Sequence, residues 1–135
     1  MKYMMMGFVD RNSQQCKDYD AGKPPDAKLM EAIGMHAEKL AKAGILQGTG
    51  GLLPFARGAR IRAAGGKLTV TDGPFIEAKE VIGGYGILQA KSKEEAIELA
   101  KAFMQIQLDV VGPSYEGTME IREMADPGAC GSDAK

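Results

Sequence analysis

The 135-residue sequence lacks several features that define common functional classes. It contains no tryptophan, one histidine and two cysteines, and Cys16 and Cys130 have neither a CxxC spacing nor neighbouring ligands, so neither a disulfide framework nor a zinc site is predicted. The 17 Lys and Arg against 18 Asp and Glu give a formal net charge of −1, which supplies no field for capturing a nucleic-acid backbone or an acidic membrane surface. We therefore expect no bound metal, no cofactor, no nucleic-acid partner and no membrane association.

Long apolar runs are also absent. The apolar stretches are a few residues long, and the opening segment MKYMMMGFVD does not combine a basic segment, a long apolar segment and a small-residue cleavage site. No transmembrane segment and no secretory signal are predicted, and a cytoplasmic location follows. The length suits one domain with a single core.

The first predicted element is a strand over residues 3–9 with apolar side chains on both faces. Its two alternating sets are Tyr3, Met5 and Val9 on one side and Met4, Met6 and Phe8 on the other. Such a strand is covered on both sides in the folded protein. The polar stretch 10–26 contains one glycine and two prolines and predicts a surface loop.

Two helices are predicted from apolar residues that recur at spacings of three and four. Asp26 is placed to cap the first helix, which runs to about residue 42 and ends before Gly44. Ser92 and Glu95 form a capping box at the start of the second helix, which must stop by Gly112.

The remaining segments predict strands. The glycine-rich residues 44–67 predict a strand start, an irregular excursion that includes residues 48–51, and a strand near residues 59–63. Residues 67–71, 80–90 and 117–123 read as further strands. The order strand, helix, two strands, helix, strand predicts an α+β fold, a ferredoxin-like β-α-β-β-α-β sandwich. Two helices cover only one face of its sheet, so we predict a homodimer formed by sheet-to-sheet packing.

One motif carries a family resemblance. Residues 69–80 read TVTDGPFIEAKE and are followed by VIGGYGIL, which resembles the YCII-related proteins of the DGPF-motif branch. The resemblance extends through KYMMM, GARIRAAGGK, SKEEAIELAK and EIRE, so residues 1–124 are identified as a YCII-related DGPF-type domain and residues 125–135 are expected to be a flexible tail. The resemblance implies a dimeric α+β barrel.

The resemblance leaves the activity open. Some YCII-type relatives are lyases acting on small ring-cleavage products, with a His and an Asp as proposed acid/base groups. Several DGPF-branch genes neighbour genes of alternative sigma factors or are fused to them, which implies a sigma-factor partner. His36 stands where many relatives carry an aromatic residue, and Gln107 and Val110 stand where relatives often show another histidine.

Two candidate catalytic residues emerge, each with a structural alternative. His36 is the only histidine and titrates near neutrality when unperturbed, but it lies on the apolar stripe of the first helix and suits a core position as well. Asp72 begins the DGPF turn, where its carboxylate can accept backbone N–H groups of the turn or act as an acid/base group.

The candidate binding residues surround the same turn. Arg60 and Arg62 share a strand face and can clamp a small anionic ligand by bidentate hydrogen bonds, or form a solvated edge. The remaining candidates shape or charge the turn: Gly73, Pro74, Phe75, Glu77, Lys79 and Glu80. The three charged residues among them fit an ion network between subunits equally well.

Two functions from different classes therefore stay open. The first is a non-catalytic ligand-binding or regulatory module that associates with a sigma factor. The second is a lyase or isomerase that transfers protons through His36 and Asp72, with Arg62 anchoring an anion.

Overall fold

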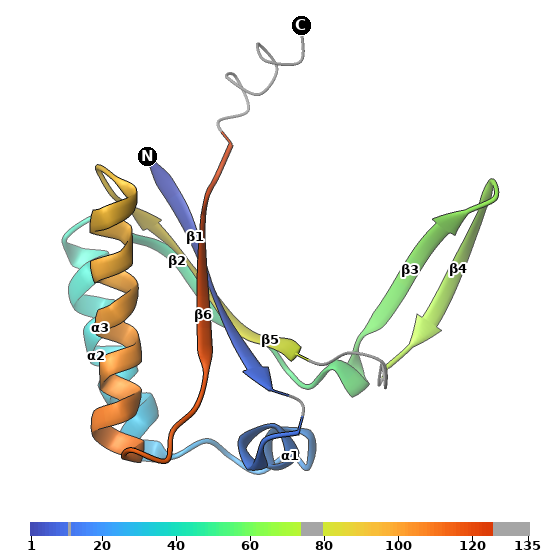
Figure 1. The fold of residues 1–135 in the computed structure, drawn as a ribbon, viewed down its shortest axis with the longest axis horizontal. Helices are drawn as coiled ribbons and strands as arrows, with labels where there is room; N and C mark the ends of the chain where they lie inside the picture. Colours follow the sequence, from blue (N-terminus) through green and yellow to red (C-terminus); the bar gives the residue numbers. More distant parts are fainter. Residues whose placement is uncertain (11, 74–79, 126–135) are drawn as a thin grey trace, which may run out of the picture.

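A four-stranded antiparallel sheet, two long helices on one of its faces and a separate two-stranded hairpin make up the fold (Figure 1). The computed structural model describes residues 1–10, 12–73 and 80–125. In chain order its elements are β1 (Lys2–Asp10), α1 (Gln14–Asp20), α2 (Ala27–Lys42), β2 (Leu46–Gly51), a 3₁₀ turn η1 (Phe55–Arg57), β3 (Ala59–Ala64), β4 (Lys67–Asp72), β5 (Glu80–Gln89), α3 (Lys93–Val111) and β6 (Thr118–Glu123).

The sheet order confirms the predicted ferredoxin-like fold. Its strands lie in the order β2-β5-β1-β6, and every neighbouring pair is antiparallel. If the four strands of this sheet are numbered 1 to 4 in chain order, the sheet reads 4-1-3-2 from its β6 edge, which is the ferredoxin-like order. The two helices of this fold are α2 and α3. The hairpin β3–β4 is an insertion between the second and third strands of the sheet.

Both long helices begin at the predicted caps. The Asp26 carboxylate accepts the backbone N–H of Lys28 at 2.8 Å, and the Ser92 hydroxyl accepts that of Glu95 at 3.1 Å. The Glu95 carboxylate in turn accepts the N–H of Lys91 at 3.3 Å, so both halves of the predicted box find a backbone donor. These bonds satisfy helix-end donors that lack a partner within the helix.

The core lies between the sheet and the two long helices. Its buried members come from β1, α2, β2, β5 and α3: Met5, Leu40, Leu46, Leu88, Ala100 and Phe103. A smaller cluster of Tyr3, Ala90 and Ala96 lies nearby. The two clusters share Leu99 and Ile121 as partly buried neighbours. This packing orients α2 and α3 over one face of the sheet.

The opposite face of the sheet is uncovered, and its part on β1 and β5 is apolar, whereas β6 adds Thr118, Glu120 and Arg122 to it. Met4, Met6 and Phe8 of β1 pair with Ile87, Tyr85 and Ile82 of β5, and paired residues project from the same face. Tyr85 is 38% exposed and Ile82 is 39% exposed. Within the described residues, both long helices lie on the other side (Figure 1). The predicted two-sided apolar character of β1 is therefore confirmed.

Two local predictions were wrong. The segment 10–26 is not a loop throughout, because residues Gln14–Asp20 form α1, which is capped by the Ser13 hydroxyl accepting the Cys16 N–H. Cys16, a residue of this helix, is completely buried. Residues 48–51 are not an excursion, because β2 continues to Gly51 through its pairing with β5.

None of the helices in the described ranges has the length and apolar character that a bilayer crossing requires.

Candidate functional site

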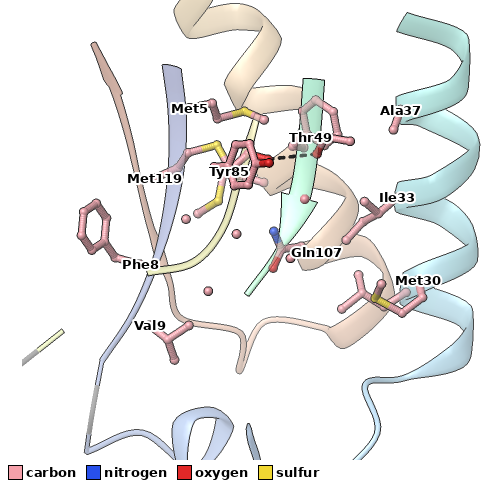
Figure 2. Close-up of a pocket in the computed structure, with 18 of the residues that line it drawn as sticks. Met5, Phe8, Val9, Met30, Ile33, Ala37, Thr49, Tyr85, Gln107 and Met119 are labelled. Carbon is pink, nitrogen blue, oxygen red and sulfur yellow. Dashed lines mark hydrogen bonds between the residues drawn. The ribbon is translucent and has the colours of Figure 1, made fainter. Parts of the chain in front are cut away.

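A cavity of about 460 Å³ lies between the sheet and the helices (Figure 2). This volume falls in the range of roughly 300–1,000 Å³ that is typical of small-molecule sites. Residues of all four sheet strands and all three helices line it. The cavity is therefore enclosed by the sheet and the helices of a single copy.

Three glycines leave the floor of this cavity without side chains. Gly7 of β1 pairs with Gly84 of β5, which pairs with Gly51 of β2, so the three form a row across three adjacent strands. Gly7 follows Met5 by two residues and shares its helix-facing side. A Cβ placed at Gly7 would have no neighbour closer than 3.9 Å, and one at Gly51 none closer than 4.0 Å. The space above Gly7 and Gly51 is thus open, whereas a Cβ at Gly84 would lie 3.3 Å from the Gly50 carbonyl oxygen.

Apolar side chains form the walls opposite this floor. Figure 2 shows Met30, Ile33 and Ala37 of α2 facing the strands across the cavity. Phe103 of α3 and Met119 of β6 close other sides. An apolar ligand would lose water contacts here as it does in most small-molecule sites.

The polar groups that line the cavity carry no formal charge at neutral pH. No Asp, Glu, Lys, Arg or His from the described residues is among the lining residues. The uncharged polar residues among them are Gln15, Tyr19, Thr49, Tyr85, Gln107, Tyr115 and Thr118. Of these, Tyr85 pairs with Met6, so its ring lies on the opposite face of the sheet. Thr49 is already occupied, because its hydroxyl donates to the Tyr85 carbonyl at 3.0 Å (Figure 2).

Tyr19 offers a hydrogen-bonding group that the described chain does not satisfy. Its hydroxyl oxygen is buried and has no hydrogen-bond partner among the described residues. Burial, followed by the charges of Asp20 and Cys16, raises the pKa of Tyr19. Burial likewise raises the pKa of Tyr115. Both phenols therefore stay protonated at neutral pH and can donate to a ligand acceptor.

Two alanine substitutions compare Gly7, on the floor of the cavity, with Gly50, which faces the Tyr85 ring. Gly7→Ala places its Cβ in open space, so we expect it to raise the free energy of unfolding by roughly 0.5–1 kcal/mol, as removal of a strand glycine does. At Gly50 a Cβ would lie 2.9 Å from the Tyr85 ring, so Gly50→Ala should destabilise by roughly 1–3 kcal/mol. Urea unfolding of both variants measures this. A lowered free energy of unfolding for Gly7→Ala would contradict the open floor.

Comparison with known proteins identifies the family. The family model of the YCII-related domain matches residues 1–112, which is most of the chain. The chain belongs to the YCII-related family. R00369 of Rhizobium meliloti (strain 1021), described as an uncharacterized protein, is 31% identical over 103 residues, which cover 76% of this chain and 78% of that protein.

His36 of this YCII-related domain lies beside the cavity and does not line it. Its ring meets the Phe103 ring edge-on, with centroids 4.8 Å apart. Its Nε2 is buried and has no hydrogen-bond partner within the described residues. Phe103 lines the cavity, so His36 packs behind a wall residue. The histidine supports that wall between α2 and α3.

Asp72, Arg60 and Arg62 lie on the hairpin, away from the cavity. All three side chains are exposed. The candidate Gly73, directly after Asp72, is half-buried. Arg60 pairs with Thr71 and Arg62 with Thr69, so the two arginines share a face as predicted. Figure 1 shows the hairpin and α2 on opposite sides of the sheet, so a single copy does not bring Asp72 to His36.

Four candidate residues, Pro74, Phe75, Glu77 and Lys79, lie outside the described residues, as does the tail from residue 126. Glu80 begins β5. The predicted roles of these residues stay predictions. Sequence reasoning missed the row of Gly7, Gly51 and Gly84 because more than thirty residues separate each of these glycines from the next along the chain. Only the strand pairing brings them side by side.

Proposed function

We propose that this domain is a non-catalytic binding module for a small, neutral and largely apolar molecule. The observation that carries the proposal is the row of Gly7, Gly84 and Gly51, which leaves room for a flat molecule over the sheet. The walls supply apolar contacts, and the Tyr19 hydroxyl supplies a donor for one polar group of the ligand.

The chemistry of the lining favours binding over turnover. A lyase or isomerase that works by proton transfer needs a group whose pKa lies near the working pH. The described lining residues offer amides, threonines and tyrosines, and the pKa of Tyr19 and Tyr115 is raised further from neutrality. An anion would also lose its hydration in this cavity without gaining a cationic partner from these residues.

A matched pair of probes tests this proposal. 1-Naphthol and 1-naphthoate have the same ring system, and only the second is an anion at pH 7. We expect isothermal titration to show binding of 1-naphthol with an affinity at least about tenfold higher than that of 1-naphthoate, since an unpaired buried charge is costly. Tighter binding of 1-naphthoate would contradict the neutral ligand class and favour an anion held by Arg60 and Arg62.

We also propose that the domain acts as a homodimer through the uncovered sheet face. The support is the apolar surface around Met6, Tyr85 and Ile87, which no described element of the same chain covers. A two-fold dimer buries identical patches against each other and suits such a face.

The finer family assignment is a further proposal. Membership of the DGPF-motif branch rests on residues 69–80, and association with a sigma factor rests on the same resemblance. Both remain predictions.

A further inference from the structure

The short helix α1 is held to the body of the domain by side-chain packing. Ser13 donates its backbone N–H to the Asp10 carbonyl at 3.0 Å, and the side-chain hydrogen bonds of the helix with other described residues stay within the segment 10–23. Cys16 is the one residue of the helix that is buried. The contact of α1 with the rest of the fold is therefore small.

A helix of this kind can move without unfolding the domain. It has seven residues, whereas isolated helices shorter than about 12–15 residues are marginal in water. Gly22, with a φ of 74°, and two prolines at positions 24 and 25 separate it from α2. Segments that bury few side chains open at a lower free energy than the core does. We therefore expect α1 to open locally.

α1 closes one end of the cavity. Gln15 and Tyr19 of this helix are among the lining residues, and they lie four positions apart, on one face of the helix. Val9 at the end of β1 and Met30 of α2 line the same cavity. Figure 1 shows α1 beyond the end of β1, outside the layers formed by the sheet and the long helices. Its movement would open the cavity.

The Tyr19 hydroxyl is the polar group that α1 offers to an occupant. Two buried side-chain polar atoms have no hydrogen-bond partner among the described residues, and they belong to Tyr19 and His36. Tyr19 lines the cavity, whereas His36 does not. A buried donor without a partner is costly, so an acceptor on a bound molecule would stabilise the closed position of α1.

The surroundings of this hydroxyl favour a neutral acceptor. Burial, followed by the charges of Asp20 and Cys16, raises the pKa of Tyr19, so the phenol keeps its proton. The same negative charge disfavours a carboxylate at this position. A ligand hydroxyl would bring a donor that needs a partner of its own, whereas a carbonyl oxygen only accepts. A ketone therefore fits the site best.

We infer that α1 is a lid that closes over a flat ligand whose neutral carbonyl oxygen accepts a hydrogen bond from the Tyr19 hydroxyl. This inference rests on the proposed binding function of the cavity. It adds the polar group that the ligand carries and the element that moves. Binding and closure are coupled, because the ligand stabilises the state to which it binds.

A matched pair of ligands tests the carbonyl contact. 2-Acetylnaphthalene and 2-isopropenylnaphthalene have nearly the same shape, and a methylene group of the second replaces the carbonyl oxygen of the first. We expect equilibrium dialysis to show that Tyr19→Phe weakens binding of the ketone by about tenfold and changes binding of the alkene by less than about threefold. Tyr3→Phe, the same exchange at a tyrosine that does not line the cavity, should leave both affinities within about threefold of the wild type.

The outcomes of this test separate the carbonyl contact from the binding site itself. No binding of either ligand by the wild type would overturn both the proposed function and the inference. Equal weakening of both ligands by Tyr19→Phe, or an unchanged affinity for the ketone, would overturn the inference and leave the cavity as an apolar binding site.

Cys16 reports the movement of the lid. Its side chain is completely buried, so reaction with N-ethylmaleimide requires α1 to open. In a Cys130→Ser background, we expect 2-acetylnaphthalene at ten times its Kd to slow this reaction about tenfold, because the ligand holds α1 closed. An unchanged rate with the ketone bound would overturn the lid.

A second thiol distinguishes movement of the lid from unfolding of the body. Ala96 of α3 is completely buried, so Ala96→Cys in a Cys16→Ser, Cys130→Ser background gives a thiol that reacts when the body opens. Without ligand, we expect Cys16 to react at least about tenfold faster than this thiol. Equal rates would overturn the lid, because Cys16 would then become exposed only as the domain unfolds.

Discussion

Replacing Leu88 with alanine should lower the free energy of unfolding by about 3–5 kcal/mol, because it removes a completely buried side chain from the centre of the core. Leu88 lies on β5, pairs with Tyr3 of β1 and Leu46 of β2, and packs in the cluster with Leu40 and Phe103. Truncation leaves a void that the surrounding strands cannot fill by a small shift. Urea unfolding, analysed by linear extrapolation, measures the effect.

The matched control is Leu108→Ala on α3, a leucine that is 41% exposed. It should cost less than about 1 kcal/mol, since surface changes are small. A cost for Leu88→Ala no larger than for Leu108→Ala would contradict the core described above.

Met6→Lys should convert the proposed dimer to a folded monomer. Met6 lies at the centre of the uncovered sheet face, between Tyr85 and Glu120 in the strand pairing. In a monomer, the lysine ammonium can reach water and pair with Glu120 across the strands. In the dimer it would be desolvated, at a cost of several kcal/mol.

The control for this variant is Met35→Lys, because Met35 is 66% exposed on α2, on the side of the sheet away from the proposed interface. Light scattering should give a dimer mass for the wild type and for Met35→Lys, and a monomer mass for Met6→Lys with native circular dichroism. A dimer mass for Met6→Lys would show that copies associate through another surface.

Much of the fold was predictable because its signals are local. The alternation of apolar residues in 3–9 fixes both faces of β1, and Asp26 and Ser92 mark the starts of the long helices. These signals depend on neighbours within a few positions, so they survive without knowledge of the tertiary structure.

The parts that the sequence did not reveal depend on distant residues. α1 was missed because its sequence QQCKDYD is polar, whereas in the structure the Ser13 cap and the burial of Cys16 support the helix. The cavity was missed because Gly7, Gly51 and Gly84 become neighbours only through strand register.

The candidate site could be predicted only in part. The shared face of Arg60 and Arg62 followed from alternation and is confirmed. The pairing of His36 with Asp72 needed a spatial relation between a helix and a hairpin that no local pattern encodes. His36 instead packs on Phe103, which agrees with the structural alternative for a histidine on an apolar stripe.

The most direct test of the proposed binding site is titration of 1-naphthol into Gly7→Val. The valine side chain would occupy the open space over the glycine row, whereas Ala64→Val adds a valine to the exposed hairpin strand β3 as a control. We predict that Gly7→Val stays folded and loses at least about tenfold in affinity for 1-naphthol, while Ala64→Val binds it as the wild type does. Equal affinity of all three proteins for 1-naphthol, or no binding by the wild type, would contradict the account.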